Sequence, residues 1–200
     1  MRTVNKEKLE QKQMEILNAA IECFANKGFY ATTTAELCRA AGMSPGTLFH
    51  YFPNKKSIIE AIALLDQQET MGIFHRNCDE SKPLASIQNV VTELLKTAQN
   101  QTFSRIFIEI SAEASRNSEI DVLFEETDAF IQKTLITLIK KGQAIEEIDK
   151  TLNPEHTALW IMSIAEGAVG RVKATSSEEL EQHIAMVCLI IHRYLNVRGQ

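Results

Sequence analysis

Apolar residues recur every three or four positions along most of the chain, a spacing that places them on one side of an α-helix. In the first such stretch, residues 8–27, the inward positions are Ile16, Leu17, Ala20, Ile21 and Phe24. The same spacing predicts helices over about 54–76, 84–99, 102–116, 119–142, 154–174 and 177–196. No stretch shows the clear alternation of a half-buried strand. With two shorter helices described next, the pattern predicts an all-α protein of about nine helices.

Between the first and fourth of these helices the pattern breaks into two short segments separated by Gly42. Thr33 and Glu36, three residues apart, are typical of a capping box that begins a helix. Ser44 followed by Pro45 suits the N-cap and the first position of the next helix. Two short helices joined by a glycine turn are the layout of a helix-turn-helix, whose second helix enters the major groove of DNA. We therefore expect a DNA-binding motif over about residues 33–52.

The second short helix has an inward and an outward side. Leu48 and Phe52 are four residues apart and face the core. We expect the outward positions, Gly46, Thr47, His50 and Tyr51, to meet DNA. Lys55 follows in the first turn of the next helix, where free backbone N–H groups also favour a phosphate.

The segment from Thr33 to Lys56, together with Ile16–Ala20 and Phe24–Phe29, resembles the DNA-binding domain of the TetR family over about residues 10–65. By this resemblance, Thr33, Thr34 and Lys55 contact phosphates, and Ser44, Gly46, Thr47, His50 and Tyr51 lie at the groove. Phe49 stands where the family usually has Tyr, which puts one phosphate contact through a hydroxyl in doubt. The resemblance implies a DNA-binding domain over residues 8–60 and a helical effector-binding and dimerisation domain over residues 61–200.

Charge is divided unevenly along the chain. The net charge is −5, yet residues 1–60 hold eight Lys and Arg against six Asp and Glu. Such asymmetry suits a DNA-contacting head on an acidic body. The small excess predicts that phosphate affinity depends on a few placed cations and on two copies acting together. The basic residues Arg2, Lys6, Lys8 and Lys12 are either a mobile arm near the DNA backbone or a solvated tail.

The last predicted helix contains eight successive apolar residues, Ile184–Ile191. A helix that is apolar all round needs both faces covered. A second copy of the last two helices would cover one face in a four-helix interface, and the alternative is burial wholly within one chain. Small residues on the preceding helix would allow close approach. The expected interface residues are Ser163, Gly167, Gly170, Ile184, Val187, Cys188 and Ile191.

The family resemblance also implies a small-molecule pocket among helices four to seven. The candidate wall residues are Met71, Phe74, His75, Phe103, Phe107, Phe124, Phe130 and Trp160. Ordinary core packing is the alternative for each, since pockets and cores share apolar linings. Arg105, Glu109 and Glu113 recur at four-residue spacing, which is typical of a solvated salt-bridge row. If that row faces inward, it favours a polar or charged effector.

These observations predict a homodimeric repressor of a palindromic operator, released by a small-molecule effector and acting on double-stranded DNA. The alternatives are a helix-turn-helix regulator without such an effector, controlled by a protein partner or acting as an activator, and more remotely an all-α enzyme. No nucleophile elbow, Walker loop, dinucleotide glycine motif or HExxH motif occurs, so we do not expect an enzyme.

No cofactor or metal is expected either. The four cysteines lack the paired spacing of a metal site, and His75 and Cys78 have no companion pair. The longest purely apolar run is too short to span a bilayer, and the N-terminus carries no apolar signal region. We therefore expect a cytoplasmic protein without a membrane partner.

Overall fold

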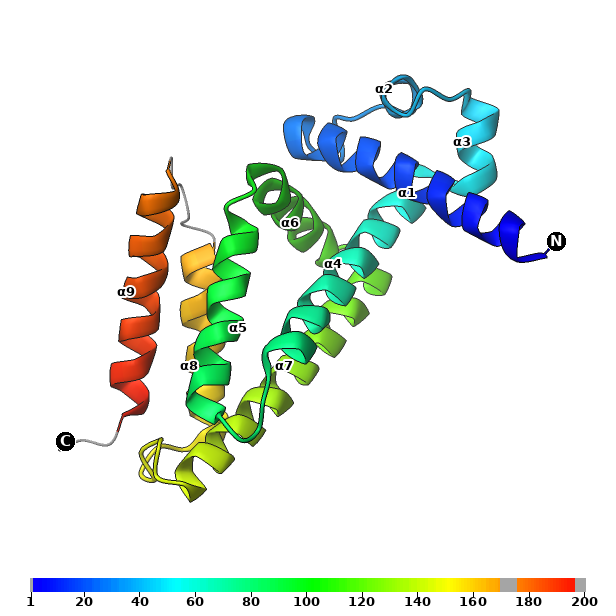
Figure 1. The fold of residues 1–200 in the computed structure, drawn as a ribbon. Coiled ribbons are helices and arrows are strands. Elements are labelled where there is room, and N and C mark those ends of the chain that lie inside the picture. The colour runs from blue at the N-terminus through cyan, green and yellow to red at the C-terminus, as the bar shows by residue number, and fades with distance from the viewer. Residues whose placement is uncertain (1, 170–175, 197–200) are drawn as a thin grey trace. The chain divides into compact units, whose positions relative to one another are not determined.

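The computed structural model describes residues 2–169 and 176–196, and within these ranges it contains helices and no strands (Figure 1). The helices are α1 (Arg2–Lys27), α2 (Thr34–Ala40), α3 (Pro45–Tyr51), α4 (Lys55–Asn77), α5 (Pro83–Ala98), α6 (Gln101–Ala114), α7 (Ser118–Ala144), α8 (Pro154–Val169) and α9 (Ser177–Leu195). The prediction of an all-α fold is confirmed.

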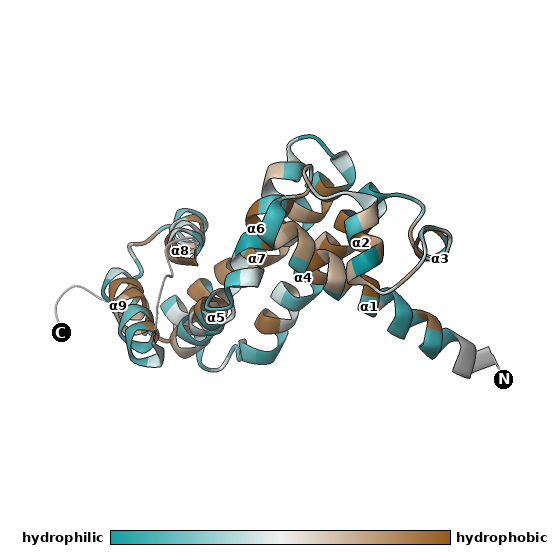
Figure 2. Cartoon of the chain, turned by 90° about the horizontal axis from the view of Figure 1, so that it is seen from above, coloured by the Kyte–Doolittle hydropathy of each residue, from teal (hydrophilic) through white to brown (hydrophobic). Residues whose placement is uncertain are grey.

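Most helix bounds lie within two residues of the predicted ones, and two differ for physical reasons. α1 begins at Arg2 rather than near residue 8, so the basic N-terminal segment is helical. Beyond its first residues, which are drawn in grey, the N-terminal half of α1 is mainly hydrophilic (Figure 2). α7 ends at Ala144, two residues past Gly142, where we expected it to end, because Gly142 does not take the positive φ of a helix-ending glycine. Gly142 is buried instead, and a Cβ there would meet the side chain of Ile148. The predicted end of α8 near residue 174, and Gly170 with it, lie outside the described residues.

The chain divides into two compact units. The first comprises Met1–Asp66 and Arg105–Leu123, and the second comprises Gln67–Ser104 and Phe124–Gln200, each within the described ranges. This division falls six residues after the boundary expected near residue 60, and it groups residues 105–123, which we expected in the C-terminal domain, with the first unit. As a result, α4, α6 and α7 each contribute residues to both units.

The first unit is built around a core from α1 to α4. Its buried side chains are Ile16, Leu17, Ala20, Phe24, Phe29, Leu37, Cys38, Leu48, Phe52, Ile58, Ile59 and Ile62. α1 ends at Gly28, whose φ of +87° suits glycine, and the Gly28 N–H donates to the Phe24 carbonyl (2.8 Å). The chain then turns back, and the Phe29 ring packs edge-on to the Phe24 ring with centroids 5.3 Å apart.

The second unit has its own core, in which α5 packs against α8 and α9. α9 gives this core a row of residues at helical spacing: Leu180, Ile184, Val187, Ile191 and Leu195. Phe74 from the end of α4 is buried in the same core, and its ring meets the Phe130 ring of α7 edge-on at 6.0 Å.

Candidate nucleic-acid interface

Local hydrogen bonds fix both ends of α2, and those at its end also fix the turn that leads into α3. At its start, the Glu36 N–H donates to the Thr33 hydroxyl (3.3 Å), and the Thr33 N–H donates to the Glu36 carboxylate (2.8 Å). This is the predicted capping box. At its end, Gly42 has a φ of +63°, its N–H donates to the Arg39 carbonyl (3.3 Å), and the Met43 N–H donates to the Cys38 carbonyl (2.9 Å). This pair of bonds is a Schellman motif, which closes α2 and redirects the chain into α3.

The capping carboxylate of Glu36 has a second partner. The Lys27 ammonium, from the last turn of α1, donates to it at 2.5 Å. That hydrogen bond, followed by those from Thr33, lowers the pKa of Glu36 to about 2. Glu36 is therefore ionised at any physiological pH, and it joins the end of α1 to the start of α2.

α3 begins with the expected cap and presents one exposed side. The Ser44 hydroxyl accepts from the Thr47 N–H (3.2 Å) and lies 2.9 Å from the Thr47 hydroxyl. Leu48 and Phe52 are buried. The structure leaves the remaining predicted positions of this helix, Gly46, Thr47 and His50, exposed. Both hydroxyls of the cap are also exposed, so the predicted base-facing positions lie together on one side of α3.

Two further details of α3 bear on DNA contact. A Cβ atom added at Gly46 would meet no atom within 4 Å, so nothing inside the protein requires a glycine there. The absence of a side chain leaves room for a ligand to approach the start of α3 closely. Phe49, which replaces the family's usual Tyr, is 42% exposed on the same helix. An exposed ring cannot donate to a phosphate, but it can contact a thymine methyl group.

The side chain of Lys55 is not free to bind a phosphate, contrary to our expectation. Its ammonium donates to the carbonyls of Phe29 (2.7 Å), Thr32 (2.9 Å) and Tyr30 (3.3 Å), and lies 4.6 Å from the centroid of the Phe29 ring. An ammonium has three N–H donors, and all three are used. Burial lowers the pKa of Lys55, partly offset by Glu113. Lys55 thus holds the turn between α1 and α2.

The row Arg105, Glu109 and Glu113 on α6 is also different from the solvated row that we expected. The Glu109 carboxylate accepts from the Phe29 N–H (2.7 Å), and the Glu113 carboxylate accepts from the Tyr30 hydroxyl (2.7 Å). Glu113 is only 7% exposed. The row therefore faces the turn after α1, within the first unit, and serves as a set of fixed contacts to that turn.

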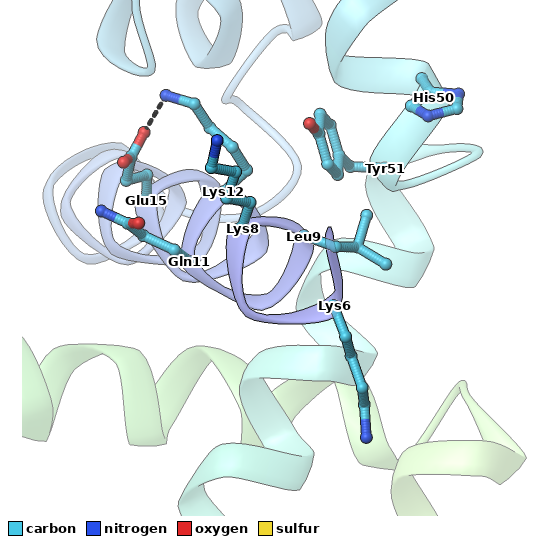
Figure 3. Close-up of a pocket in the computed structure, with 8 residues that line it drawn as sticks. All are labelled: Lys6, Lys8, Leu9, Gln11, Lys12, Glu15, His50 and Tyr51. Carbon is cyan, nitrogen blue, oxygen red and sulfur yellow. Dashed lines mark hydrogen bonds and ion pairs between the residues drawn. The ribbon is translucent and has the colours of Figure 1, made fainter. Parts of the chain in front are cut away.

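An open groove of about 770 Å³ lies between the first turns of α1 and the end of α3 (Figure 3). Its lining residues are Lys6, Lys8, Leu9, Gln11, Lys12, Glu15, His50 and Tyr51. Tyr51, which we expected at the DNA groove, is half-buried here, and its ring lies edge-on to the His50 ring at 5.3 Å. The sequence suggested that these lysines could lie near DNA, but it did not predict that they share a groove with α3.

The predicted effector-pocket residues are not all inside the second unit. Phe74 is buried, and the rings of Phe74 and His75 both contact the Phe130 ring. Met71, Phe103, Phe107 and Phe124 are half-buried, and Phe107 belongs to the first unit. Trp160 is 60% exposed on α8. The ring contacts around Phe130 belong to the packed core of the second unit, and the effector pocket stays a prediction.

The predicted dimer residues also need correction. Ile184, Val187 and Ile191 are buried in the core of their own chain, and Cys188 is half-buried with its sulfur 3.5 Å from the Thr92 hydroxyl. Ser163 and Gly167 are exposed as expected. The exposed apolar residues of the same helices are Leu159 and Trp160 on α8 and Met186, Leu189, Ile190 and Tyr194 on α9.

Over residues 2–169 and 176–196, no helix combines the length and apolar character needed to cross a bilayer. Within the same ranges, no three His, Cys, Asp or Glu side chains are grouped so that they could hold a metal ion. The candidate site is the exposed side of α3 together with the groove beside it.

Comparisons with known proteins agree with this placement. Residues 16–62 match the family described as "Bacterial regulatory proteins, tetR family", and residues 83–195 match "BetI-type transcriptional repressor, C-terminal". The chain is 27% identical over 163 residues to the HTH-type transcriptional regulator UidR of Escherichia coli K12, covering 80% of each protein. Salmonella enterica GusR is 26% identical with a TM-score of 0.73, covering 92% of this chain and 95% of that one. AibR, solved with isovaleryl coenzyme A and operator DNA, shares the fold at 16% identity and a TM-score of 0.73, covering 90% and 98%.

Proposed function

Because the chain belongs to the TetR family of bacterial transcriptional regulators, we propose that it is a homodimeric repressor that binds a palindromic operator and is released by a small-molecule effector. Family membership makes it a DNA-binding regulator and not an enzyme. The dimer, the symmetry of the operator and the effector are the parts that we propose, and each has separate support.

The exposed apolar side of α8 and α9 carries the proposal of a dimer. Trp160 is 60% exposed and Met186 is 56% exposed, on two helices that pack against each other. Large apolar side chains that gather on one side of a protein mark an interaction surface. Ser163 and Gly167, exposed on α8, would let a neighbouring helix approach closely. Two copies meeting through this surface would form a self-complementary four-helix interface.

A dimer would explain how a weakly charged head binds DNA. Residues 1–60 carry only two more basic than acidic side chains. Each phosphate neutralised adds to affinity, so two heads on one duplex double the number of contacts. Two-fold helix-turn-helix proteins place their recognition helices in half-sites about one helical turn apart. The operator should therefore be a palindrome with that spacing.

An effector would act through the second unit. There the Phe130 ring of α7 contacts the rings of both Phe74 and His75 on α4, and α4 continues into the first unit. A ligand releases DNA only if it binds more tightly to a conformation that fits DNA poorly. AibR, which shares the fold, was solved with both an acyl coenzyme A and operator DNA. This supports a small molecule as the signal.

The dimer can be tested with one charged substitution and a matched control. We expect Trp160→Glu to sediment as a monomer at micromolar concentration and to lose operator affinity, because it places a charge on the interface. Ile145→Glu is the control, since Ile145 is 54% exposed in the same unit but lies just after α7. A monomeric wild type would overturn the proposed dimer, and a Trp160→Glu variant that is still a dimer would overturn the interface through α8 and α9.

The operator and the effector need separate experiments. Selection of bound duplexes from a random pool should yield a two-fold symmetric sequence. A thermal-shift screen with metabolites and lipophilic cations should then find a compound that stabilises the protein saturably and releases that duplex. If stabilising compounds never affect DNA binding, a protein-partner-controlled regulator becomes the better account.

A further inference from the structure

The basic residues at the start of α1 divide into two sides of the helix. Lys8 and Lys12 are four residues apart and extend on the same side of α1, the side on which Tyr51 lies (Figure 3). Lys6 extends away from Tyr51 (Figure 3). Its ammonium is 3.7 Å from the Glu10 carboxylate, which lies one turn later on α1. Lys8 and Lys12 therefore share the groove wall that faces Tyr51, whereas Lys6 lines the groove from another side of α1.

The opposite wall comes from α3. Tyr51 presents its hydroxyl toward Lys8 and Lys12 (Figure 3). Glu15 raises the pKa of Lys12, first through their hydrogen bond and then through its negative charge. Next to Tyr51, His50 lies at the exposed side of α3 that we expect to meet bases. The groove is thus continuous with the proposed DNA-reading surface.

We propose that this groove holds a stretch of the DNA sugar-phosphate backbone, with Lys8, Lys12 and the Tyr51 hydroxyl as phosphate donors. Two ammonium groups and a phenol supply only hydrogen-bond donors to an anion between them, and such contacts position a protein on DNA without reading its sequence. Continuity with the outward side of α3 favours DNA over an acidic peptide as the occupant. The inference rests on the proposed function, because it assumes that α3 enters the major groove.

Glu15 lies beside Lys12 and would compete with a DNA phosphate for the Lys12 ammonium. Its carboxylate accepts a hydrogen bond from the Lys12 ammonium, and both side chains are nearly half exposed. Exposed ion pairs of this kind contribute little and are weakened by salt, so a phosphate can displace the carboxylate. Removing the negative charge of Glu15 should therefore strengthen DNA binding, although it breaks an ion pair within the protein.

The test is a salt titration of DNA affinity with single-charge variants. Lys8→Gln, Lys12→Gln and Glu15→Gln of α1, and Lys150→Gln as the control, are compared with wild type on the selected operator and on a random-sequence duplex, by fluorescence anisotropy between about 50 and 200 mM KCl. We expect Lys8→Gln and Lys12→Gln each to reduce the slope of log K against log salt by about 0.9 per protomer. Both should weaken the two duplexes about equally, because phosphate contacts carry no sequence information.

The controls separate the groove from a general charge effect. Lys150→Gln removes the same charge from the second unit, where the exposed ammonium lies 2.7 Å from the Glu146 carboxylate and outside the groove, and it should keep the wild-type slope. Glu15→Gln should bind more tightly than wild type. Equal slopes for all three lysine variants, or weaker binding by Glu15→Gln, would overturn the inference. If the wild type binds its operator, and Lys8→Gln and Lys12→Gln have the wild-type slope, the inference about the groove is wrong but the proposed function is not. If the wild type binds no duplex, both the groove and the proposed function are wrong.

Discussion

Replacing Lys55 by Met removes the ammonium that joins three backbone carbonyls and keeps most of the side-chain stem. Phe29, Tyr30 and Thr32, which supply those carbonyls, form the turn between α1 and α2. Phe29 and Thr32 are buried, whereas Tyr30 is exposed. In the variant, water can readily replace the ammonium at the Tyr30 carbonyl but less readily at the other two. The predicted effect is therefore a loss of folding stability.

The size of this stability loss is set by the two carbonyls that belong to buried residues. A buried acceptor left without a donor costs about 1–3 kcal/mol. Lys55 itself is half-buried, so partial access of water argues for the lower part of that range at each carbonyl. We expect the free energy of unfolding to fall by about 2–3 kcal/mol in total. For a chain of this length, that corresponds to a fall in Tm of about 5–10 °C.

Two assays distinguish this role from a phosphate contact, and Lys56 supplies a matched control. Lys56→Met removes the same charge one residue later, where the ammonium is exposed and lies 3.3 Å from the Glu60 carboxylate. An exposed ion pair contributes about 0–1 kcal/mol, so its Tm should change little. Thermal unfolding of both variants gives the stability effect. Salt titration of operator binding, at a temperature where Lys55→Met is folded, gives the number of phosphates neutralised.

One combination of results would refute a purely structural role for Lys55. If Lys55 binds a phosphate, Lys55→Met should reduce the salt slope by about 0.9 per protomer with little change in Tm. The hydrogen bonds described here predict the reverse, a lower Tm and a nearly unchanged slope. A Tm equal to that of Lys56→Met, combined with the reduced slope, would return Lys55 to the DNA contacts.

Three further substitutions test other features of the two units. Gly46→Ala should leave Tm unchanged or slightly higher, because the added Cβ meets nothing within 4 Å, yet it should weaken operator binding in an anisotropy titration; unimpaired binding would show that α3 does not approach DNA at this point. Gly42→Ala should instead lower the free energy of unfolding by about 1–2 kcal/mol, because its φ is +63° and an L side chain is strained there; a neutral result in chemical unfolding would contradict this. Desolvation raises the pKa of Asp66 from 3.8 to about 6, so the native state binds the extra proton and loses stability as pH rises through that window. Asp66→Asn should therefore have a higher Tm than wild type above pH 6 and no such advantage below pH 3.8, and parallel profiles of Tm against pH would argue against it.

Local chemistry made the motif between α2 and α3 predictable. The capping box of Thr33 and Glu36 and the left-handed turn at Gly42 involve residues within five positions of each other. Such signals depend on residue type and spacing, which a sequence displays directly. The same applies to the inward positions of α3, whose spacing of four separates Leu48 and Phe52 from their exposed neighbours.

Contacts between distant residues could not be predicted in this way. Glu109 and Phe29 are 80 positions apart, and nothing in the spacing of the α6 row indicates which backbone it meets. The inward side of α9 was misassigned for a different reason. Eight successive apolar residues, Ile184–Ile191, contain no polar residue to mark the exposed side, so periodicity cannot choose between the two faces. Only packing against α5 and α8 shows that Ile184, Val187 and Ile191 face inward.

The turn between α1 and α2 is held by two helices that enter the first unit from different parts of the chain. The Lys55 ammonium of α4 donates to the Phe29 carbonyl. The Glu109 carboxylate of α6 accepts from the N–H of the same Phe29. Glu113 adds a bond to the Tyr30 hydroxyl. α4 and α6 each also contribute residues to the second unit. Because Lys55 of α4 and Glu109 of α6 both bind the backbone that leads into α2, a change in the position of either residue would alter the support of that turn.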